Sequence, residues 1–378
     1  MSEPAEYTFE DDPELASTLP GFTYWDRDWF EREKRRIFRR NWRCVGHVSD
    51  IPDAGDYLAH RLVDQPVMVL RGPDGDIRAF HNVCKHRAHV LLGEERGNLG
   101  APLITCPYHA WAYDMGGQLR AAPHCEHIRG FSRSEIRLDP VRVEVIAGFI
   151  YINLNPDAPP LLPEIDPAMD RFQELCGDLA GLRRAASVTF DVAANWKNVG
   201  DNLLECYHCH PAHKAFVDLV DMDTYRVETE PLWSWQGGIC RPRNLAYRIP
   251  DGLDDAEREF VTLYIWPDMA FTRFAGSGSV ATFVFEALGP EETRQVFTVY
   301  TPSGELDPVS SDIYRYFCDV LGPEDVGLVE SVQQGLHSVS YNRGRFFVDE
   351  DRSWFSEHAV HHFHALVDRH MRSPSGNP

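Results

Sequence analysis

The sequence lacks any apolar run long enough to cross a membrane, which takes roughly 20 residues. It also lacks a signal-peptide pattern, a G-x-G-x-x-G loop for a dinucleotide, an internal repeat and a low-complexity block. Basic residues are few: 37 Lys and Arg stand against 58 Asp and Glu, and the net charge of −21 argues against nucleic-acid binding. The absences predict a protein that binds neither membranes nor nucleic acid.

The length of the chain and its number of cysteines are both informative. Its 378 residues suggest two domains with an ample core. Nine cysteines, four of them close to the motifs described next, predict a reducing, cytoplasmic location when no secretory signal is present.

Cysteine and histidine are combined in two short motifs, Cys84-x-His86 and Cys106-x-x-His109. Each follows a short apolar stretch that reads as a strand. Two thiolates and two imidazoles at this spacing are what a Rieske [2Fe-2S] cluster needs, with the cysteines on one iron and the histidines on the other. Zinc is the alternative, but zinc modules commonly use C-x2-4-C and H-x3-5-H pairs, whereas each half here mixes the two residue types. The spacing therefore favours the cluster.

A second set consists of Glu205-x-x-His208 and His213. Residues 195–208 are predicted to be helical, which places Glu205 and His208 on one face at i, i+3. His213 lies about 140° round an ideal helix from His208, so Pro211 is expected to bend the chain and bring both imidazoles to one ion. Two such histidines are typical of a 2-His-1-carboxylate site, in which mononuclear Fe(II) activates O₂. The alternative, a helix end with surface histidines, would be favoured if the upstream motif were absent.

The carboxylate ligand is expected near the start of another helix, which Gly322-Pro323 indicates. Glu324 and Asp325 follow, and either carboxylate could simply favour the helix dipole. Apolar residues lie three, four, seven and eleven places after Asp325, which predicts that it lies on a buried stripe; they are Leu328, Val329, Val332 and Leu336. Glu324 is predicted to project away from this stripe, over Gly327, Ser331 and Gly335. A carboxylate on an apolar face should be paired or metal-bound, so Asp325 is the predicted iron ligand.

Cys206 and Cys209 form a C-x-x-C within the second set. That spacing can indicate a redox disulfide. Because free cysteine is among the most buried residue types, we interpret both as small packing residues.

A cluster that delivers electrons and an iron that activates O₂ imply an oxygenase. The chain resembles the α subunits of Rieske non-heme iron oxygenases over nearly its full length, and among them the branch of carnitine oxygenase, choline and glycine betaine monooxygenases and stachydrine demethylase. The matching segments are residues 82–87, 106–111, 195–197, 205–208 and 323–341. The resemblance implies an α+β fold, with an all-β Rieske [2Fe-2S] domain and a helix-grip catalytic domain built on an antiparallel sheet.

The same resemblance implies how electrons travel. Glu205 would bridge His208 of its own subunit and a Rieske histidine, His109, of a neighbour in a homotrimer. Electrons from NAD(P)H would come from a separate flavin and iron–sulfur reductase, with or without a ferredoxin. One cluster and one Fe(2+) per subunit are expected, with O₂ as co-substrate.

Motif positions predict three segments. Residues 1–42 are an N-terminal helical part of the catalytic domain, residues 43–155 the Rieske domain, and residues 156–378 the catalytic domain with the mononuclear iron. Short strands separated by turn signals fill the second segment.

The predicted reaction is monooxygenation, by hydroxylation, N-demethylation or C–N cleavage, of a small quaternary ammonium or N-methylated compound. Aromatic side chains attract such cations by about 0.5–2 kcal/mol per good contact. The predicted pocket residues are Trp233, Trp235, Tyr264, Trp266, Phe271 and Phe283. The enzymatic alternative is ring hydroxylation or N-dealkylation of a neutral aromatic or amide compound, and the non-enzymatic one is a Rieske electron carrier.

Overall fold

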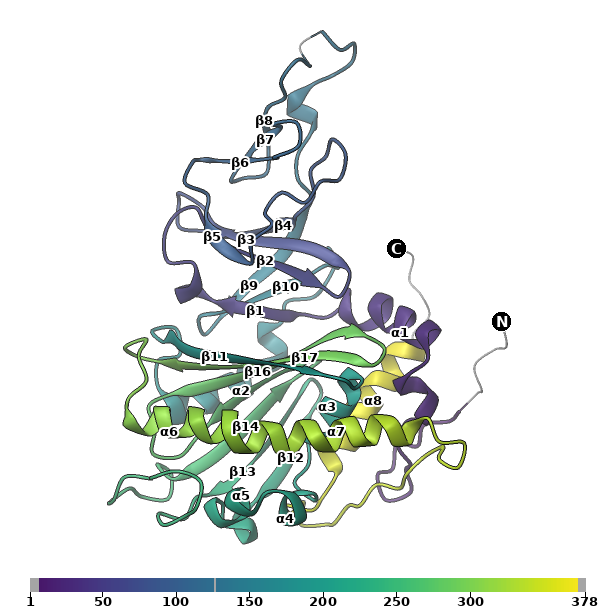
Figure 1. Ribbon diagram of the computed structural model, residues 1–378, viewed down its shortest axis with the longest axis vertical. Helices are drawn as coiled ribbons and strands as arrows, with labels where there is room; N and C mark the ends of the chain where they lie inside the picture. The colour runs from purple at the N-terminus through teal and green to yellow at the C-terminus, as the bar shows by residue number, and fades with distance from the viewer. Residues whose placement is uncertain (1–6, 126, 373–378) are drawn as a thin grey trace. The chain divides into compact units, whose positions relative to one another are not determined.

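The computed structural model describes residues 7–125 and 127–372, which fold as two compact units (Figure 1). The large unit comprises Met1–Ile37 and Leu162–Pro378, and the small unit comprises Phe38–Leu161. The boundaries predicted from the motifs, after residues 42 and 155, lie within several residues of these.

The small unit is built from strands. Seven of them form an antiparallel sheet in the order β1 (Arg43–His47), β10 (Phe149–Asn153), β9 (Pro140–Ile146), β4 (Ile77–His81), β3 (Gln65–Arg71), β2 (Asp56–Leu62) and β5 (Arg96–Asn98). A second sheet contains β6 (Leu103–Thr105), β7 (Ala112–Asp114) and β8 (Leu119–Ala121). Between these strands the described helical structure consists of short 3-10 turns, η3 (Val48–Asp50) and η4 (Arg133–Glu135). The expected all-β domain is confirmed.

Strand β3 shows how the small unit builds its core. Successive side chains of a strand point to opposite faces. Met68 and Leu70 join an apolar cluster that also contains Cys84, whereas Val67 and Val69 join a second cluster on the other face. Because both faces are buried, this strand is a continuous apolar run in the sequence.

The large unit contains one antiparallel sheet of seven strands (Figure 1). Their order is β11 (Arg183–Val192), β17 (Glu292–Thr301), β16 (Val280–Gly289), β15 (Met269–Arg273), β14 (Glu259–Ile265), β13 (Trp233–Ile239) and β12 (Arg226–Glu230). The inner strands β13, β14 and β15 are buried along almost their whole length, so both faces of the sheet are covered. The predicted antiparallel catalytic domain is confirmed.

Helices cover the two faces. On one face, Phe172 of α2 (Leu162–Cys176) packs against Trp235 and Phe271. On the other lie α3 (Trp196–Leu203) and the long helical stretch that ends in α7 (Gly322–Leu336). The remaining helices are α1 (Arg27–Glu33), α4 (Cys209–Ala212), α5 (Lys214–Leu219), α6 (Pro308–Tyr316) and α8 (His358–Arg372). A π-helical turn, Phe317–Leu321, joins α6 to α7 without a break.

A buried ion pair holds α3 in place. Lys197 and Glu33 are fully buried, and their Nζ and Oε1 atoms are 2.6 Å apart. The indole N–H groups of Trp29 and Trp196 also donate to Glu33, and Lys197 donates to the side chain of Asn195, which caps the helix. A buried pair whose other hydrogen bonds are satisfied has a well-defined geometry. It therefore sets the direction of α3, and the second metal site begins at the end of this helix.

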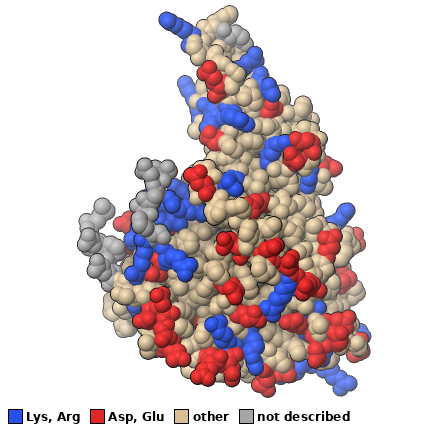
Figure 2. All heavy atoms as spheres, turned by 180° about the vertical axis from the view of Figure 1, so that it is seen from behind, with Lys and Arg blue, Asp and Glu red and all other residues tan. Residues whose placement is uncertain are grey.

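On the face drawn in Figure 2, Asp and Glu side chains spread over the surface with Lys and Arg among them. The net charge of −21 is thus not gathered in one stripe on this face. Among the described residues, no helix combines the length and the apolar character that a membrane crossing requires.

Candidate metal centres

Two loops of the small unit bring the first four predicted ligands together. Cys84 and Cys106 are buried thiols, unpaired by any disulfide, in the same apolar cluster. His86 and His109 are exposed, and their Nδ1 atoms are 3.2 Å apart. A buried thiol pair beside an exposed imidazole pair fits a [2Fe-2S] cluster, with sulfur ligands for the inner iron and nitrogen ligands for the outer one.

The two loops share one backbone conformation. In each, the cysteine N–H donates to the carbonyl five places on, and the cysteine carbonyl accepts from the N–H four places on. The residues at that fourth place, Ala88 and Ala110, have φ of 56° and 55°. This left-handed conformation costs a non-glycine residue about 1–2 kcal/mol, so the surrounding hydrogen bonds must hold it. Loops of the same backbone conformation after β4 and β6 therefore each present one cysteine and one histidine, with the histidine two places after Cys84 and three places after Cys106.

Two aromatic residues contact the cluster ligands; Trp111 lies within the motif of residues 106–111, whereas Tyr113 was not predicted. The Tyr113 hydroxyl accepts from the Lys85 N–H at 3.0 Å and lies 3.3 Å from Cys84 Sγ. The ring of Trp111 stacks on His86 at 4.9 Å between centroids. Partners of this kind orient ligands and tune a metal centre. Tyr113 could not be found from spacing, because it reaches Cys84 from another strand.

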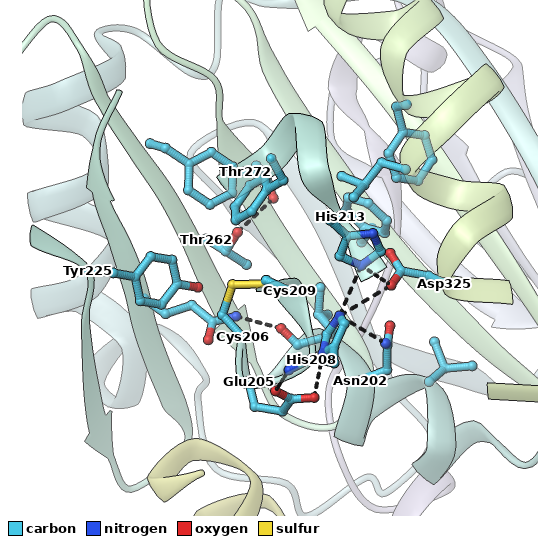
Figure 3. A pocket seen from close by; sticks show the side chains of 18 of the residues that line it. Asn202, Glu205, Cys206, His208, Cys209, His213, Tyr225, Thr262, Thr272 and Asp325 are labelled. Atoms are coloured by element: carbon cyan, nitrogen blue, oxygen red, sulfur yellow. Dashed lines mark hydrogen bonds and ion pairs between the residues drawn. A yellow bond between two sulfur atoms is a disulfide. The ribbon is translucent and has the colours of Figure 1, made fainter. Parts of the chain in front are cut away.

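The second site lies in the large unit (Figure 3). Each of His208, His213 and Asp325 offers one ligand atom, and the three atoms lie within 4.8 Å of one another. The Nε2 atoms of the two histidines are 3.0 Å apart, and His213 Nε2 is 3.0 Å from Asp325 Oδ1. Two imidazoles and one carboxylate that converge on one point fit the 2-His-1-carboxylate arrangement of mononuclear Fe(II).

Two glutamates orient the imidazoles by contacting Nδ1, the ring nitrogen opposite the ligand atom Nε2. Glu205 Oε1 is 2.5 Å from His208 Nδ1, and Glu205 Oε2 accepts from the His208 backbone N–H at 3.1 Å. Glu324 Oε2 is 2.8 Å from His213 Nδ1. Each carboxylate would hold a proton on Nδ1 and so leave Nε2 free to bind a metal. The prediction that Glu324 points away from the site was wrong, because the first turn of α7 presents both acidic residues to His213.

The helix predicted over residues 195–208 is shorter than expected. Helix α3 ends at Leu203, and Glu205 lies in a turn before α4. The two short helices α4 and α5 meet at His213, whose φ of −116° and ψ of 71° are not helical. The bend that brings the second imidazole to the first therefore lies at His213, while Pro211 lies within α4.

The buried stripe predicted for Asp325 is only partly present. Val329 and Leu336 are buried, but Leu328 and Val332 are 38% and 52% exposed. Helix α7 is therefore covered along a narrower face than the periodicity suggested. Asp325 reaches the histidines because it lies in the first turn of α7, not because the whole stripe is buried.

The acidic neighbours outweigh burial in setting the charge of the imidazoles. Burial lowers the pKa of His208, but Asp325 and Glu205 raise it to about 10. Burial also lowers the pKa of His213, but Asp325 and Glu324 raise it more, so the net shift is upward. Burial raises the pKa of Asp325, but the two histidines lower it more, so its pKa falls below the usual value. A divalent cation must therefore displace protons from this site, and we expect its affinity to rise with pH.

The pocket beside these residues has an aromatic lining that differs from the predicted one. Phe283 is the one predicted aromatic residue among those lining the described pocket. Trp235 and Phe271 pack under α2 on the other face of the sheet, and Tyr264 and Trp266 pack against Phe363 of α8. Trp233 does not line the pocket either. The aromatic lining consists of Phe216, Tyr225, Phe260, Phe274, Phe283 and Phe317.

Cys206 and Cys209 form a disulfide, so the interpretation as packing thiols was wrong. Both residues are buried and line the pocket, and Figure 3 shows their disulfide close to His208. The turn between α3 and α4 brings their Cα atoms to 4.9 Å, well within the range a disulfide needs.

Glu357 gives the large unit a pH-dependent stability. The pKa of its carboxyl is raised to about 7, mainly by burial. The charges of Glu205 and Asp201 also raise this pKa, whereas the hydrogen bond from the Phe347 N–H lowers it. The folded state therefore keeps a proton that the unfolded state loses above its lower pKa, so stability falls as pH rises from about 4.5 to about 7. We expect Glu357→Gln to raise the melting temperature by about 2–4 °C at pH 8 and hardly at all at pH 5.

The exposed Glu350→Gln is the matched control for this prediction, because it removes the same charge from the preceding loop. Its melting temperature should follow the wild type at both pH values. An equal gain in both variants at pH 8 would show that net charge, not the buried carboxyl, causes the effect.

Comparisons with known families identify both domains. Residues 41–132 match the Rieske [2Fe-2S] domain, and residues 179–373 match the catalytic domain of the ring hydroxylating α subunit. The second match removes the electron-carrier alternative, because a carrier has no need of such a domain. Its members are non-heme iron oxygenases that use O₂ and electrons supplied by a reductase.

The chain is similar to individual enzymes over nearly its whole length. It is 37% identical to the carnitine monooxygenase oxygenase subunit of Escherichia coli, with 94% of each chain covered. It is 35% identical to the glycine betaine monooxygenase oxygenase subunit of Pseudomonas aeruginosa, covering 95% of this chain and 93% of that one. The structure of a quaternary ammonium Rieske monooxygenase, which gave insights into carnitine oxidation and inter-subunit electron transfer, superposes with a TM-score of 0.89 at 34% identity, covering 97% of this chain and all of that one. The chain therefore belongs to the α subunits of the Rieske non-heme iron oxygenases and is an oxidoreductase.

Proposed function

We propose that this protein is the oxygenase component of an NAD(P)H-dependent monooxygenase for a small quaternary ammonium or N-methylated compound. The lining of the pocket beside His208, His213 and Asp325 carries this proposal. Six aromatic rings line it, and no Lys or Arg is among its described lining residues. Such a lining favours a cation, because each ring face attracts one by about 0.5–2 kcal/mol. The carnitine and glycine betaine enzymes named above support the same substrate class.

Five of the six rings belong to two groups in edge-to-face contact, and Phe297 behind them contacts both groups. Phe260 contacts Phe216 and Phe274 at 5.1 and 5.6 Å between centroids, and Phe283 contacts Phe317 at 4.8 Å. Rings held edge to face in this way cannot easily turn, so they offer a rigid surface to methyl groups on nitrogen. A neutral aromatic compound could fit against the same rings, but it would not gain the cation–π attraction that they offer.

We assign the following roles to side chains of this chain. Cys84, His86, Cys106 and His109 would hold the cluster, and His208, His213 and Asp325 the mononuclear iron. When bound, the cluster supplies single electrons and the iron supplies the O₂ activation that puts one oxygen atom into the substrate and the other into water. Glu205 and Glu324 keep the imidazoles oriented, and the phenylalanine rings exclude water.

The proposed electron path joins two subunits. Glu205 holds the Nδ1 side of His208, which faces away from the ligand atoms, and it is partly exposed. A second subunit could therefore offer the exposed His109 to the same carboxylate, as in the predicted homotrimer. A flavin and iron–sulfur reductase, with or without a ferredoxin, would supply the electrons. We also propose a cytoplasmic location, since seven of the nine cysteines form no disulfide.

Metal content and turnover test the proposal together. The purified protein should hold about three irons per chain, two in the cluster and one in the mononuclear site. With a suitable reductase, NADH and O₂, quaternary ammonium compounds should yield product in proportion to NADH consumed, measured as aldehyde release and by mass spectrometry. Product from neutral aromatic or amide compounds, and none from ammonium compounds, would contradict the assigned substrate class.

A further inference from the structure

Tyr225 brings a hydroxyl without a protein partner to the pocket. It lies between η5 (Met222–Thr224) and β12, lines the pocket and is 2% exposed. In Figure 3 its hydroxyl is at the end of the ring that points toward the Cys206–Cys209 disulfide. Among the residues that the structure describes, none hydrogen-bonds to this hydroxyl. A buried tyrosine hydroxyl usually has a partner, so this one calls for a group from outside the chain.

The Tyr225 hydroxyl is also open to a ligand. The hydroxyl of Tyr316 lacks a partner as well, but it is closed to water, whereas the hydroxyl of Tyr225 remains accessible. A donor that is left unsatisfied inside a protein costs about 1–3 kcal/mol. A ligand oxygen has the size of a water oxygen, so it can reach this hydroxyl and remove that cost.

The surroundings of this hydroxyl make it a donor and disfavour a second negative charge. Burial and, to a smaller extent, the charge of Glu205 raise the pKa of Tyr225. The hydroxyl therefore keeps its proton and can donate a hydrogen bond to an oxygen. Glu205 would repel a carboxylate held by this hydroxyl, as it disfavours the phenolate, whereas it would not repel an uncharged oxygen.

The lining also lacks a cationic side chain that could pair with a carboxylate. Arg273, on β15, donates to the backbone carbonyls of residues 256, 257 and 259, and it does not line the pocket. Apart from Glu205 and the metal ligands, the polar side chains that line the described pocket are uncharged; they are Asn202, Tyr225, Gln236, Thr262, Thr272 and Gln295. A substrate carboxylate would find no counter-ion among these side chains, and burying an unpaired charge is costly.

We propose that the Tyr225 hydroxyl donates a hydrogen bond to an uncharged oxygen of the substrate, such as a hydroxyl or carbonyl oxygen. This inference rests on the proposed function and narrows it to quaternary ammonium compounds that carry an alcohol, ester or amide group. The aromatic rings would hold the cationic end of the substrate and Tyr225 its oxygen. A site that hydrogen-bonds a substrate oxygen discriminates against analogues that lack it. Tyr225 is thus a specificity-determining residue.

Tyr225→Phe tests the inference, because it removes the hydroxyl and keeps the ring. Three ligands that share a trimethylammonium group are compared: choline with a hydroxyl, propyltrimethylammonium with a methyl in its place, and glycine betaine with a carboxylate. Binding to the anaerobic holoenzyme is measured by calorimetry, which keeps binding separate from turnover. We expect the wild type to bind choline about five- to tenfold more tightly than propyltrimethylammonium, and more tightly than glycine betaine. In Tyr225→Phe, the preference for choline over propyltrimethylammonium should fall to within about twofold.

Tyr207→Phe is the matched control and should keep the wild-type preference, because Tyr207 is exposed and does not line the pocket. Unchanged iron content and unchanged affinity for propyltrimethylammonium show that Tyr225→Phe keeps its pocket. Equal binding of choline and propyltrimethylammonium to the wild type, an unchanged preference in Tyr225→Phe, or tighter binding of glycine betaine than of choline would each overturn the inference and leave the proposed function intact. Failure of all three ligands to bind would overturn the proposed function and this inference with it.

Discussion

Replacing Asp325 by alanine is expected to remove the mononuclear iron and abolish product formation while the cluster remains. Asp325 Oδ1 is the carboxylate atom next to the two Nε2 atoms, at 3.0 Å from His213 and 3.5 Å from His208. Without it, two neutral imidazoles would be left to hold a divalent cation. Iron should fall from about three to about two per chain, and the visible absorbance of the cluster should persist.

Glu324→Gln is the matched control, because it changes the adjacent carboxylate in the same turn of α7. Glu324 contacts His213 at Nδ1, on the far side from the ligand atoms. Loss of such a supporting hydrogen bond typically weakens metal binding or activity by about 10–100-fold, so added Fe(II) should restore turnover in this variant and not in Asp325→Ala. A full complement of iron and normal turnover in Asp325→Ala would show that the carboxylate ligand lies elsewhere.

Replacing Glu205 by glutamine is expected to leave both metal centres filled and to slow electron transfer between them. Glutamine has the size of glutamate, but it lacks the charge that favours a proton on the imidazole at each side. Partners of metal-bound histidines influence activity by about 10–100-fold, and a bridge between two centres should lie at or beyond the upper end. The measurement is a single turnover, in which the reduced variant is mixed with O₂ and substrate and cluster oxidation is followed by absorbance.

Glu357→Gln is the control in this experiment, because it changes the charge near Glu205 without changing the proposed bridge. Its carboxyl is close enough to Glu205 for their charges to interact, but its own hydrogen bond is to the backbone of Phe347. It should therefore oxidise its cluster at a rate near that of the wild type. Equal rates in Glu205→Gln and the wild type would take Glu205 out of the electron path, together with the main argument for a trimer.

The cluster loops were within reach of sequence reasoning because they are local structures. The hydrogen bonds that shape each loop join the cysteine to residues four and five places away, so the motif contains most of its own geometry. The chemistry of the ligands was equally visible, since two thiols and two imidazoles suit few cofactors. What brought the two loops to one point was the packing of β4 and β6 in one core, which the spacing could only suggest.

The second site shows where local patterns misled. Helical periodicity extended α3 beyond Leu203 and hid the turn in which the Cys206–Cys209 disulfide forms. The same reasoning placed Glu324 away from the metal ligands, although the first turn of α7 presents it to His213. Both errors have one cause: periodicity says which residues share a face, but not where a helix ends or what faces it.

The sequence alone determined the fold class, the order of the two domains and a set of ligands with the chemistry of an iron oxygenase. Only the tertiary structure decided which side chains form the pocket. Strand β13 begins with alternating apolar and polar residues, Trp233-Ser234-Trp235-Gln236, but β13 to β15 are buried on both faces, so the alternation does not tell which of the two faces lines the pocket. Trp235 and Gln236 are neighbours in the chain, yet one packs under α2 and the other lines the pocket. Which side chains line the pocket depends on which helix covers each face of the sheet. The residues of those helices are far away in the sequence from the strands.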